Sequence, residues 1–194
     1  MQRLNSVNPQ VAQGRPRELL DTVQQAFGMI PNVAKVMANS PAVLESFLAF
    51  STAMGAVKIG GKLHNQVKLA TSETNSCDYC TSILSAVAPA AGLSAADILT
   101  GRTGNSTDHR TMAALACAHD VLESRVKVSN QQLAAVLDAG LGDAEIVEIV
   151  ASVVLGCFTN FLNNLAQTEL DVPRVAPVGG FSSSNRGATA GSAL

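Results

Sequence analysis

Apolar residues recur at alternating steps of three and four positions along most of this chain, and that spacing places side chains on one face of an α-helix. Leu20, Val23 and Phe27 form one such series, and the longest runs from Ile146 to Leu165. No segment alternates apolar and polar residues with the period of two that a half-buried β-strand shows. The sequence therefore predicts an all-α fold.

Proline, glycine and capping residues divide this pattern into separate helices. Ser94 with Asp97, and Ser129 with Gln132, have the spacing of capping boxes. The pair Gly60–Gly61 predicts a break in the chain. The expected helix starts are Pro16, Pro31, Pro41, Lys62, Cys77, Ser94, Asp108, Ser129 and Asp143, and the expected stops include Gly28, Asn75, Gly101, Gly140 and Pro173.

We expect one folded domain over residues 16–173, preceded by a lead-in over residues 1–15. A chain of 194 residues with a hydrophobic fraction of 47% suits a single domain with a sizeable core. From Arg174 onward, Gly, Ser and Ala dominate. Such a segment buries too little apolar surface to offset its loss of conformational entropy, so residues 174–194 are predicted to form a flexible tail.

Charge and targeting signals restrict the partners and the compartment. The net charge is −2 and the charges are scattered, so neither nucleic acid nor a membrane surface is an expected partner. No uninterrupted apolar run approaches the roughly 18 residues that span a bilayer. The first ten residues also lack the apolar core of a secretory signal. Four cysteines in such a chain favour a reducing compartment, and we predict a cytoplasmic protein.

The segment Cys77-Asp78-Tyr79-Cys80 is the strongest chemical signal in the sequence. Two thiols at this spacing on the first turn of a helix can close a disulfide. The partial positive charge of a helix N-terminus favours the thiolate, which attacks a peroxide or a disulfide while its neighbour resolves the intermediate. The other interpretation is packing, because Cys77, Cys80, Leu84 and Val87 share one face. Spacing alone leaves both open.

Several segments resemble one family over residues 16–173. Val67–Ser76, which leads into the cysteine pair, resembles the active-site approach of the carboxymuconolactone decarboxylase and alkylhydroperoxidase-D (AhpD) family. Phe27–Asn32 with Asn39–Pro41 resembles its N-terminal helices, and Phe158–Asn164 its final helix. The resemblance implies an all-α, AhpD-like helical fold with a Cys-x-x-Cys at the start of a helix. It also implies a homo-oligomer, either a trimer or a hexamer.

The proton relay of that family is incomplete in this sequence. In the family a Glu stands twelve positions before the first Cys and a His four positions after the second, and here these positions hold Asn65 and Leu84. Neither side chain exchanges protons at neutral pH. General acid–base catalysis typically contributes about 10²- to 10⁴-fold in rate, so thiol chemistry should be slower but need not be lost. Leu84 also predicts a more apolar pocket, a hydrophobic substrate and a raised thiol pKa.

Three side chains are the candidate substitutes in the proton relay. Glu73 lies four residues before Cys77, and His64 is the neighbour of Asn65 in the sequence. Asn65 itself occupies the relay position without a titratable group. For all three, the competing interpretation is a polar, solvated helix face.

Four further polar or sulphur-containing positions allow a structural interpretation. Asn160, Asn163 and Asn164 crowd one end of the last helix, and buried amides need partners, so they either cross-link helices or line a pocket. Cys157 beside Gly156 predicts close helix packing.

No cofactor and no metal are expected. The sequence has no Gly-rich phosphate loop and no dinucleotide fingerprint, and Cys117 with His119 lacks the spacing of a zinc site.

The leading hypothesis is a thiol-dependent alkylhydroperoxidase-like enzyme, or a disulfide oxidoreductase, with Cys77 and Cys80 as catalytic residues and an incomplete relay. Its expected partners are a small-molecule substrate such as an organic hydroperoxide and a thiol reductant. The resemblance implies that Cys80 attacks and Cys77 resolves. Two alternatives remain: a cofactor-free decarboxylase or lyase of the same fold, and a non-catalytic or redox-sensing homologue.

Overall fold

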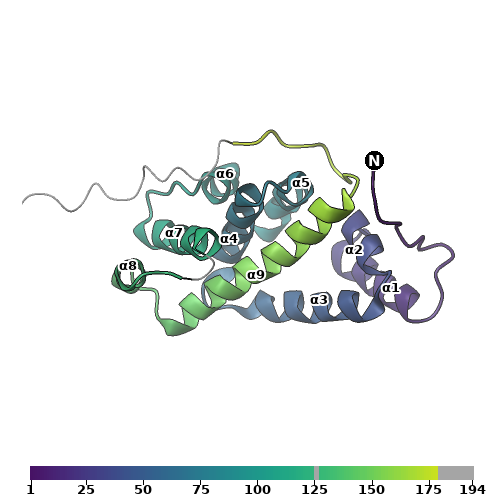
Figure 1. Cartoon of the computed structure of the whole chain (residues 1–194), viewed down its shortest axis with the longest axis horizontal. Coiled ribbons are helices and arrows are strands. Elements are labelled where there is room, and N and C mark those ends of the chain that lie inside the picture. The colour runs from purple at the N-terminus through teal and green to yellow at the C-terminus, as the bar shows by residue number, and fades with distance from the viewer. Residues whose placement is uncertain (125–126, 179–194) are drawn as a thin grey trace, which may run out of the picture.

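The computed structural model describes residues 1–124 and 127–178, and all regular structure within them is helical (Figure 1). The predicted all-α fold is confirmed. The α-helices are α1 (Arg15–Phe27), α2 (Asn32–Met37), α3 (Pro41–Ala53), α4 (Gly60–Thr74), α5 (Asp78–Val87), α6 (Ala95–Thr103), α7 (His109–Glu123), α8 (Asn130–Asp138) and α9 (Asp143–Ala166). Two short 3₁₀ helices, Met54–Ala56 and Ala88–Ala91, follow α3 and α5.

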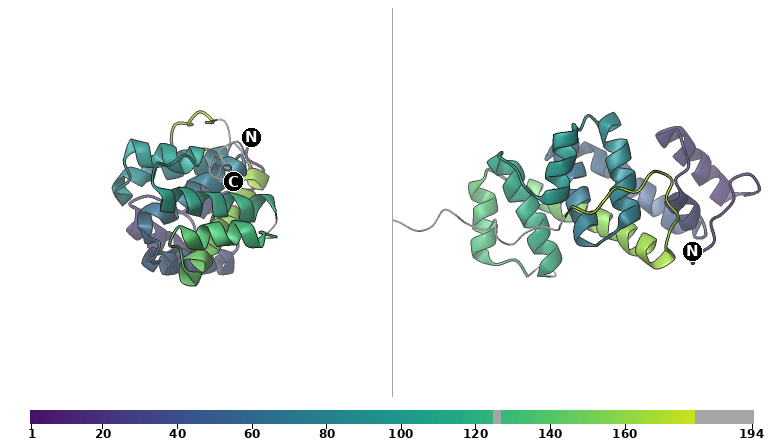
Figure 2. Two further views of the ribbon diagram at one scale, coloured as in Figure 1. Left: turned by 90° about the vertical axis from the view of Figure 1, so that its left-hand side faces the viewer. Right: turned by 90° about the horizontal axis from the view of Figure 1, so that it is seen from above.

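Helices α4 and α9 organise the molecule. Helix α4 packs against α5, α6, α7 and α9, and α9 runs diagonally across the front of the bundle in Figure 1. Helices α1 and α2 lie at one end and α8 at the other, as the two further views in Figure 2 also show. The N-terminal end of α5 therefore meets the C-terminal half of α9, and this is where the cysteine pair lies.

Two apolar clusters fill most of the interior. The larger cluster joins α4, α7 and α9 and includes Val136 of α8, and the smaller cluster joins α1, α2 and α3. The largest fully buried side chains include Leu20, Leu44, Leu69, Leu115 and Ile149. Leu20 and Ile149 lie within the segments whose helical spacing predicted a buried face, so part of this burial follows from the sequence pattern.

The predicted caps are confirmed at three helix starts. The Ser94 hydroxyl accepts the backbone N–H of Asp97 at 3.1 Å, and the Ser129 hydroxyl accepts that of Gln132 at 3.3 Å. In both pairs the reciprocal bond of the capping box is also present. Asp108 caps α7 by accepting the N–H of Thr111 at 2.8 Å.

Gly101 and Gly156 allow two close helix contacts. A Cβ added to Gly101 would lie 2.9 Å from the Cα of Gln66, and one added to Gly156 would lie 2.9 Å from the Thr71 side chain. The predicted close packing beside Cys157 is confirmed. The predicted end of a helix at Gly101 is wrong, because this glycine lies inside α6 against α4 and the helix continues to Thr103.

Two further helix boundaries differ from the prediction. Gly60–Gly61 forms the first turn of α4 instead of a break, and the irregular segment precedes it. Helix α9 ends at Ala166 and not at Pro173, because Gln167 adopts left-handed backbone angles with φ 51° and its N–H bonds to Asn163. Its stop is therefore a left-handed C-cap, which proline spacing does not reveal.

Residues 167–178, here called the C-terminal strap, follow α9 and pass over α5 toward α6 (Figure 1). The predicted flexible tail, residues 174–194, begins inside this strap, and its part from residue 179 lies outside the described residues. The predicted lead-in also has contacts with the bundle. The N–H of Arg3 donates to the Ala166 carbonyl at 2.7 Å, and that of Val7 donates to Lys35.

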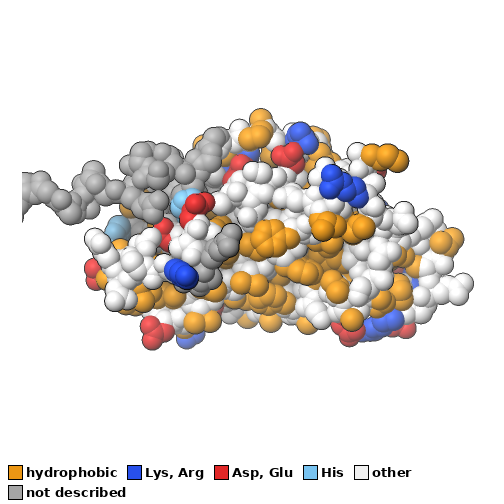
Figure 3. Space-filling view, in the orientation of Figure 1, with side chains coloured by type: hydrophobic (Ala, Val, Ile, Leu, Met, Phe, Trp, Pro, Cys, Tyr) orange, Lys and Arg blue, Asp and Glu red, His pale blue; other side chains and the backbone are white. Residues whose placement is uncertain are grey.

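Helix α9 has an apolar side that faces outward. Val154, Phe161 and Leu165 are more than half exposed, and Figure 3 shows hydrophobic side chains gathered across this face. By length and hydropathy alone α9 could span a bilayer, with 33% of its most apolar window buried, although the sequence has no uninterrupted apolar run. Core helices of soluble proteins pass the same test, and α9 packs against α3, α4, α5 and α7.

Candidate active site

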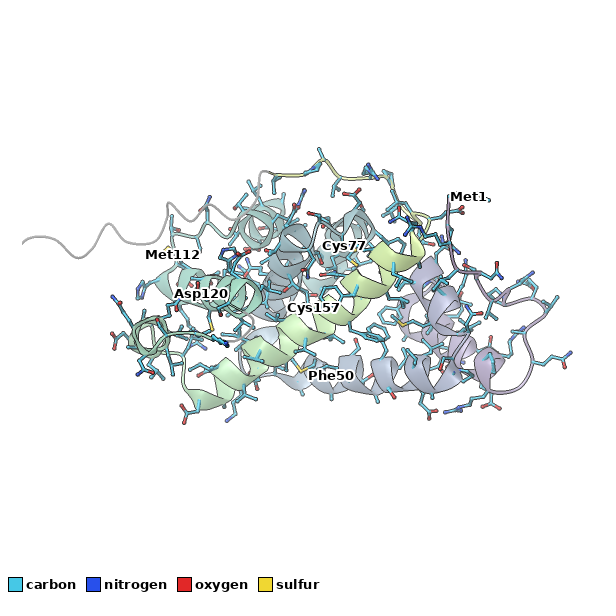
Figure 4. All side chains as sticks on the ribbon, in the orientation of Figure 1. Met1, Phe50, Cys77, Met112, Asp120 and Cys157 are labelled. Carbon is cyan, nitrogen blue, oxygen red and sulfur yellow. The ribbon has the colours of Figure 1, made fainter. Side chains whose placement is uncertain are left out.

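Cys77 lies at the start of α5, close to α9 (Figure 4), and Cys80 follows in the first turn of α5. Cys77 is the N-cap, and its sulphur accepts the backbone N–H of Cys80 at 3.3 Å. The Cys77 thiol also donates to the Cys80 sulphur, and the two sulphur atoms are 2.7 Å apart. Both thiols are free and buried. Because a disulfide bond measures about 2.05 Å, oxidation requires little movement of the backbone.

The turn before Cys77 fixes the direction of α5. Ser76 adopts a positive φ of 50°, and the N–H of Cys77 bonds to the Ser72 carbonyl at 2.9 Å. The side-chain amide of Asn164 donates to the Asn75 carbonyl at 2.9 Å, which attaches the turn to α9. The N-terminal end of α5, with its unpaired N–H groups, is thereby held against α9.

The predicted role of the α9 amides is confirmed, and they do more than join helices. Asn160 accepts from Asn75 at 2.9 Å and donates to the Ser72 hydroxyl at 3.1 Å, so it connects α9 to α4. Asn163 donates its Nδ2 to the sulphur of Cys80 at 3.2 Å. The sequence shows three Asn residues close together near the end of α9, but only the packing of α5 against α9 shows that Asn163 contacts a thiol.

These contacts separate the pKa values of the two thiols. The hydrogen bond from Cys77 lowers the pKa of Cys80 to about 7, helped by bonds from Asn160, Asn163 and Thr159, while burial opposes the shift. The pKa of Cys77 is raised, because its proton is held by Cys80 and its sulphur is buried. The raised pKa expected for the pair is therefore wrong for Cys80, where hydrogen-bond donors outweigh desolvation.

Lys68 on α4 is a charged neighbour that the sequence reading missed. Burial lowers the pKa of its ammonium group, and the Cys80 thiolate opposes that shift. A cation near a sulphur favours the thiolate. His64, Lys68 and Ser72 are spaced four residues apart on α4 and so share a face. This four-residue spacing could have identified Lys68 from the sequence, because it places Lys68 on the same face as Ser72, whose carbonyl accepts the N–H of Cys77.

His64, one candidate relay substitute, is bonded to α9. Its Nδ1 lies 2.8 Å from the Ser152 hydroxyl, which itself donates to the Glu148 carbonyl at 2.7 Å. The imidazole must therefore donate from Nδ1. Burial and the positive charge of Lys68 lower the pKa of His64 to about 4, so the ring is neutral at physiological pH.

Glu73 and Asn65, the other two candidates, also have partners away from the thiols. The Glu73 carboxylate forms a buried ion pair with Arg102 of α6, with Nε and Oε1 2.5 Å apart. Asn65 donates to the Gly61 carbonyl of its own helix at 2.9 Å. In the described part of the chain, the hydrogen bonds to the two sulphurs come from within the pair and from α9. Leu84, at the other relay position, is partly buried.

The C-terminal strap closes the site from outside. Asp171 accepts the Tyr79 hydroxyl at 2.5 Å and the N–H of Asn32 at 2.9 Å, and Arg174 pairs with Asp78 at 2.7 Å. Burial and the bond to Asp171 raise the pKa of Tyr79, so this phenol stays protonated. Leu170 packs on the small cluster formed by both cysteines and Tyr79. The strap therefore helps to bury both sulphurs.

A hollow of about 340 Å³ opens beside the pair. We call it the polar hollow. Its lining comes from the turn before α5, from the end of α9, from the strap and from the N-terminus: Met1, Gln2, Ser76, Asp78, Tyr79, Asn163, Asn164, Gln167, Thr168, Glu169, Leu170 and Arg174. Most of these side chains are polar. The sequence predicted an apolar pocket because of Leu84, but the hollow next to Asn163 is lined mostly by polar side chains.

The other two cysteines differ from the pair. Burial raises the pKa of Cys117 to about 11, and Cys157 is a partly buried thiol near the Asn75 amide at 3.5 Å. Within residues 1–124 and 127–178, no three His, Cys, Asp or Glu side chains are placed to hold a metal ion.

Comparisons with known proteins identify the fold. No protein-family model and no curated protein matches the chain. Among solved structures, the AhpD core of an uncharacterised peroxidase-related protein from Ralstonia eutropha JMP134 aligns with a TM-score of 0.72 and 21% identity, over 88% of this chain and 92% of that one. A peroxidase-related protein from Silicibacter sp. TM1040 aligns with a TM-score of 0.68 and 20% identity, over 86% and 88%.

A third similar structure is a cysteine-to-alanine variant of the debrominase Bmp8 in complex with 2,3,4-tribromopyrrole. It aligns with a TM-score of 0.70 and 19% identity, over 86% of this chain and 94% of that one. At these identities the likeness is one of fold. The chain has the AhpD-like fold that the resemblance implied.

Proposed function

We propose that this AhpD-like protein is a thiol-dependent peroxidase or disulfide oxidoreductase, in which Cys80 attacks and Cys77 resolves. The observation that supports it best is the contrast between two sulphurs 2.7 Å apart. Cys80 receives hydrogen bonds and has a pKa of about 7, whereas the pKa of Cys77 is raised. Near neutral pH, Cys80 is therefore partly ionised and nucleophilic while Cys77 remains a thiol.

In the proposed reaction the Cys80 thiolate attacks one oxygen of a hydroperoxide. The O–O bond breaks, a sulfenic acid forms on Cys80, and the departing alkoxide takes up a proton to leave as an alcohol. The sulphur of Cys77 then attacks the sulfenic sulphur. The S–S bond forms, and the thiol proton and the sulfenic hydroxyl leave as water. A thiol reductant returns two electrons and restores the dithiol.

The surroundings replace part of the missing relay. Asn163 stabilises the Cys80 thiolate as a hydrogen-bond donor, which Asn65 and Leu84 at the usual Glu and His positions do not. Lys68 interacts electrostatically with Cys80 and is our candidate to protonate the alkoxide. Amides do not exchange protons at neutral pH, so the donors assist nucleophilic attack more than departure of the alcohol.

The first test is an intact-mass measurement with a free-thiol count, before and after one equivalent of cumene hydroperoxide. We expect prompt loss of two thiols and two hydrogens, and none in Cys80→Ser. Cys117→Ser is the matched control, because Cys117 is a buried thiol outside the pair and should leave the reaction intact. Four thiols that stay unreactive in the native protein would overturn the proposal.

A turnover assay on native and alkylated protein separates the alternatives. A decarboxylase-like or other lyase activity predicts turnover that survives alkylation of the thiols, and a redox sensor predicts a reversible disulfide without turnover. Because the tribromopyrrole complex shares this fold, that compound joins the hydroperoxides as a test electrophile. We place the activity in the cytoplasm, where thiols are kept reduced.

We also propose that the chain forms a homo-oligomer, a trimer or a hexamer. The outward face of α9, with Val154, Phe161 and Leu165, supports this because contiguous exposed apolar side chains mark association surfaces. Light scattering should give a multiple of 20.0 kDa for the wild type. Phe161→Asp should reduce the mass, whereas a wild-type monomer would refute self-association.

A further inference from the structure

The polar hollow is adjacent to the reactive sulphur through one side chain. Asn163 lines the hollow and donates its Nδ2 to Cys80 at 3.2 Å. Ser76, Asp78 and Tyr79 line it as well, and they flank Cys77 in the sequence. A molecule in the hollow therefore contacts residues that flank Cys77 and that bond to Cys80; neither sulphur lines the hollow, so exchange requires the lining to open toward the disulfide.

Two buried side-chain oxygens in its lining residues have no hydrogen-bond partner. They are Oδ1 of Asn163 and Oγ1 of Thr168, and the two residues are 3% and 8% exposed. Buried polar atoms almost always have partners. A ligand whose N–H groups reach these atoms as the lining adjusts would supply the missing bonds.

The rim of the hollow carries both signs of charge. Arg174 and Asp78 pair at 2.7 Å but are 63% and 46% exposed, so the pair is weak and each partner can exchange the other for a ligand group. Glu169 adds a second carboxylate. A ligand with a carboxylate for Arg174 and an ammonium group for Asp78 or Glu169 matches this arrangement, whereas a purely apolar ligand has no group for any of these charges.

We propose that the polar hollow binds a small zwitterionic thiol, either cysteine or a short cysteine-containing peptide, as the reductant of the Cys77–Cys80 disulfide. This inference rests on the proposed function and names the reductant class for it. The backbone-type N–H groups of a peptide suit Asn163 and Thr168, and its charged termini suit the rim.

The reduction balances with two ligand thiols. The first, as thiolate, attacks one sulphur of the Cys77–Cys80 disulfide, the S–S bond breaks, and the released cysteine takes up a proton. The second ligand thiol attacks the mixed disulfide. The ligand disulfide leaves, and the protein returns to the dithiol.

The test compares two thiols on the full-length oxidised protein, prepared with diamide so that no peroxide step is needed. The probes are glutathione, which is a zwitterionic cysteine peptide, and 2-mercaptoethanol, which is neutral. We expect the rate of disulfide reduction to saturate with glutathione and to stay linear with 2-mercaptoethanol. Arg174→Gln should raise the half-saturating glutathione concentration by roughly two- to fivefold and should change the rate with 2-mercaptoethanol by a smaller factor.

Arg17→Gln is the matched control, because Arg17 also forms a surface ion pair, with Asp21 of α1 at 2.8 Å, and does not line the hollow. Linear kinetics with both thiols, or an equal effect of both arginine variants, would overturn the binding site. S-methylglutathione, which cannot exchange, should bind in calorimetry and compete with glutathione. Failure of the peroxide reaction alone, with saturable reduction intact, would sink the peroxidase proposal and not this one.

Discussion

Replacing Asn163 with alanine should raise the pKa of Cys80. The wild-type contact is a hydrogen bond from Nδ2 to the sulphur at 3.2 Å. Hydrogen bonds to charged groups contribute about 1.5–3 kcal/mol, and about 1.4 kcal/mol corresponds to one pKa unit. Loss of this bond from the thiolate should therefore move the Cys80 pKa from about 7 to about 8–9.

The assay is the rate of alkylation by iodoacetamide as a function of pH, with Cys80 followed by peptide mass. A higher pKa reduces the thiolate fraction at neutral pH by about 5- to 50-fold, but nucleophilicity rises with pKa at a Brønsted slope of about 0.4–0.5. The net rate at neutral pH should fall by about two- to sixfold. At high pH the variant should instead react faster than the wild type.

Asn164→Ala is the control for this experiment. Asn164 is the next residue of α9 and lines the same hollow, but its amide donates to the Asn75 carbonyl and not to a sulphur. Its Cys80 pKa should therefore rise by less than that of Asn163→Ala. An unchanged Cys80 titration in folded Asn163→Ala would refute the assigned role of this amide and leave the Cys77 thiol as the cause of the low pKa.

Three further predictions concern stability. Arg102→Ala should lower the free energy of unfolding by about 3–5 kcal/mol in denaturant titrations, because it leaves the Glu73 carboxylate buried and unpaired. The control is Arg110→Ala, which breaks a more exposed ion pair with Glu145 and should change the free energy of unfolding by less than about 1 kcal/mol. Gly101→Ala should lower the melting temperature, with a loss of about 1–3 kcal/mol from the clash with the α4 backbone. Because the folded pKa of Cys80 is lowered while those of Cys77 and Cys117 are raised, the test is the difference in the free energy of unfolding between the reduced wild type and Cys80→Ser, and this difference should fall by about 1–3 kcal/mol as the pH falls from 9 to 7.

The fold could be predicted because its determinants are local. The capping box of Ser94 and the N-cap of Asp108 need only three or four neighbouring residues, and burial follows from helical spacing. The predicted helix boundaries were wrong where contacts with other helices, or backbone conformation, determine where a helix ends. Gly101 looked like a stop, but its small size serves a contact with α4, and α9 ended early at a left-handed Gln167.

The candidate site was predicted only at its centre. Cys77 and Cys80 start α5 as their spacing indicates. Glu73 looked available to the thiols because it precedes Cys77 by one helical turn, yet it pairs with Arg102, 29 residues away. The contact from Asn163 to Cys80 likewise joins residues 83 positions apart. No pattern within one helix encodes such pairings, since they depend on how helices cross.

The exchange of titratable groups for amides changes what such a site does well. A Glu and His relay both removes the thiol proton and protonates the departing group, whereas the Asn163 amide exchanges no proton and can only stabilise the thiolate. His64 is neutral and bonded to Ser152, so it adds no acid at physiological pH. For the proposed activity, attack stays efficient while departure of the alkoxide depends on Lys68 or water. The site therefore favours substrates whose leaving group is already a weak base, and it discriminates most strongly against those that need an acid.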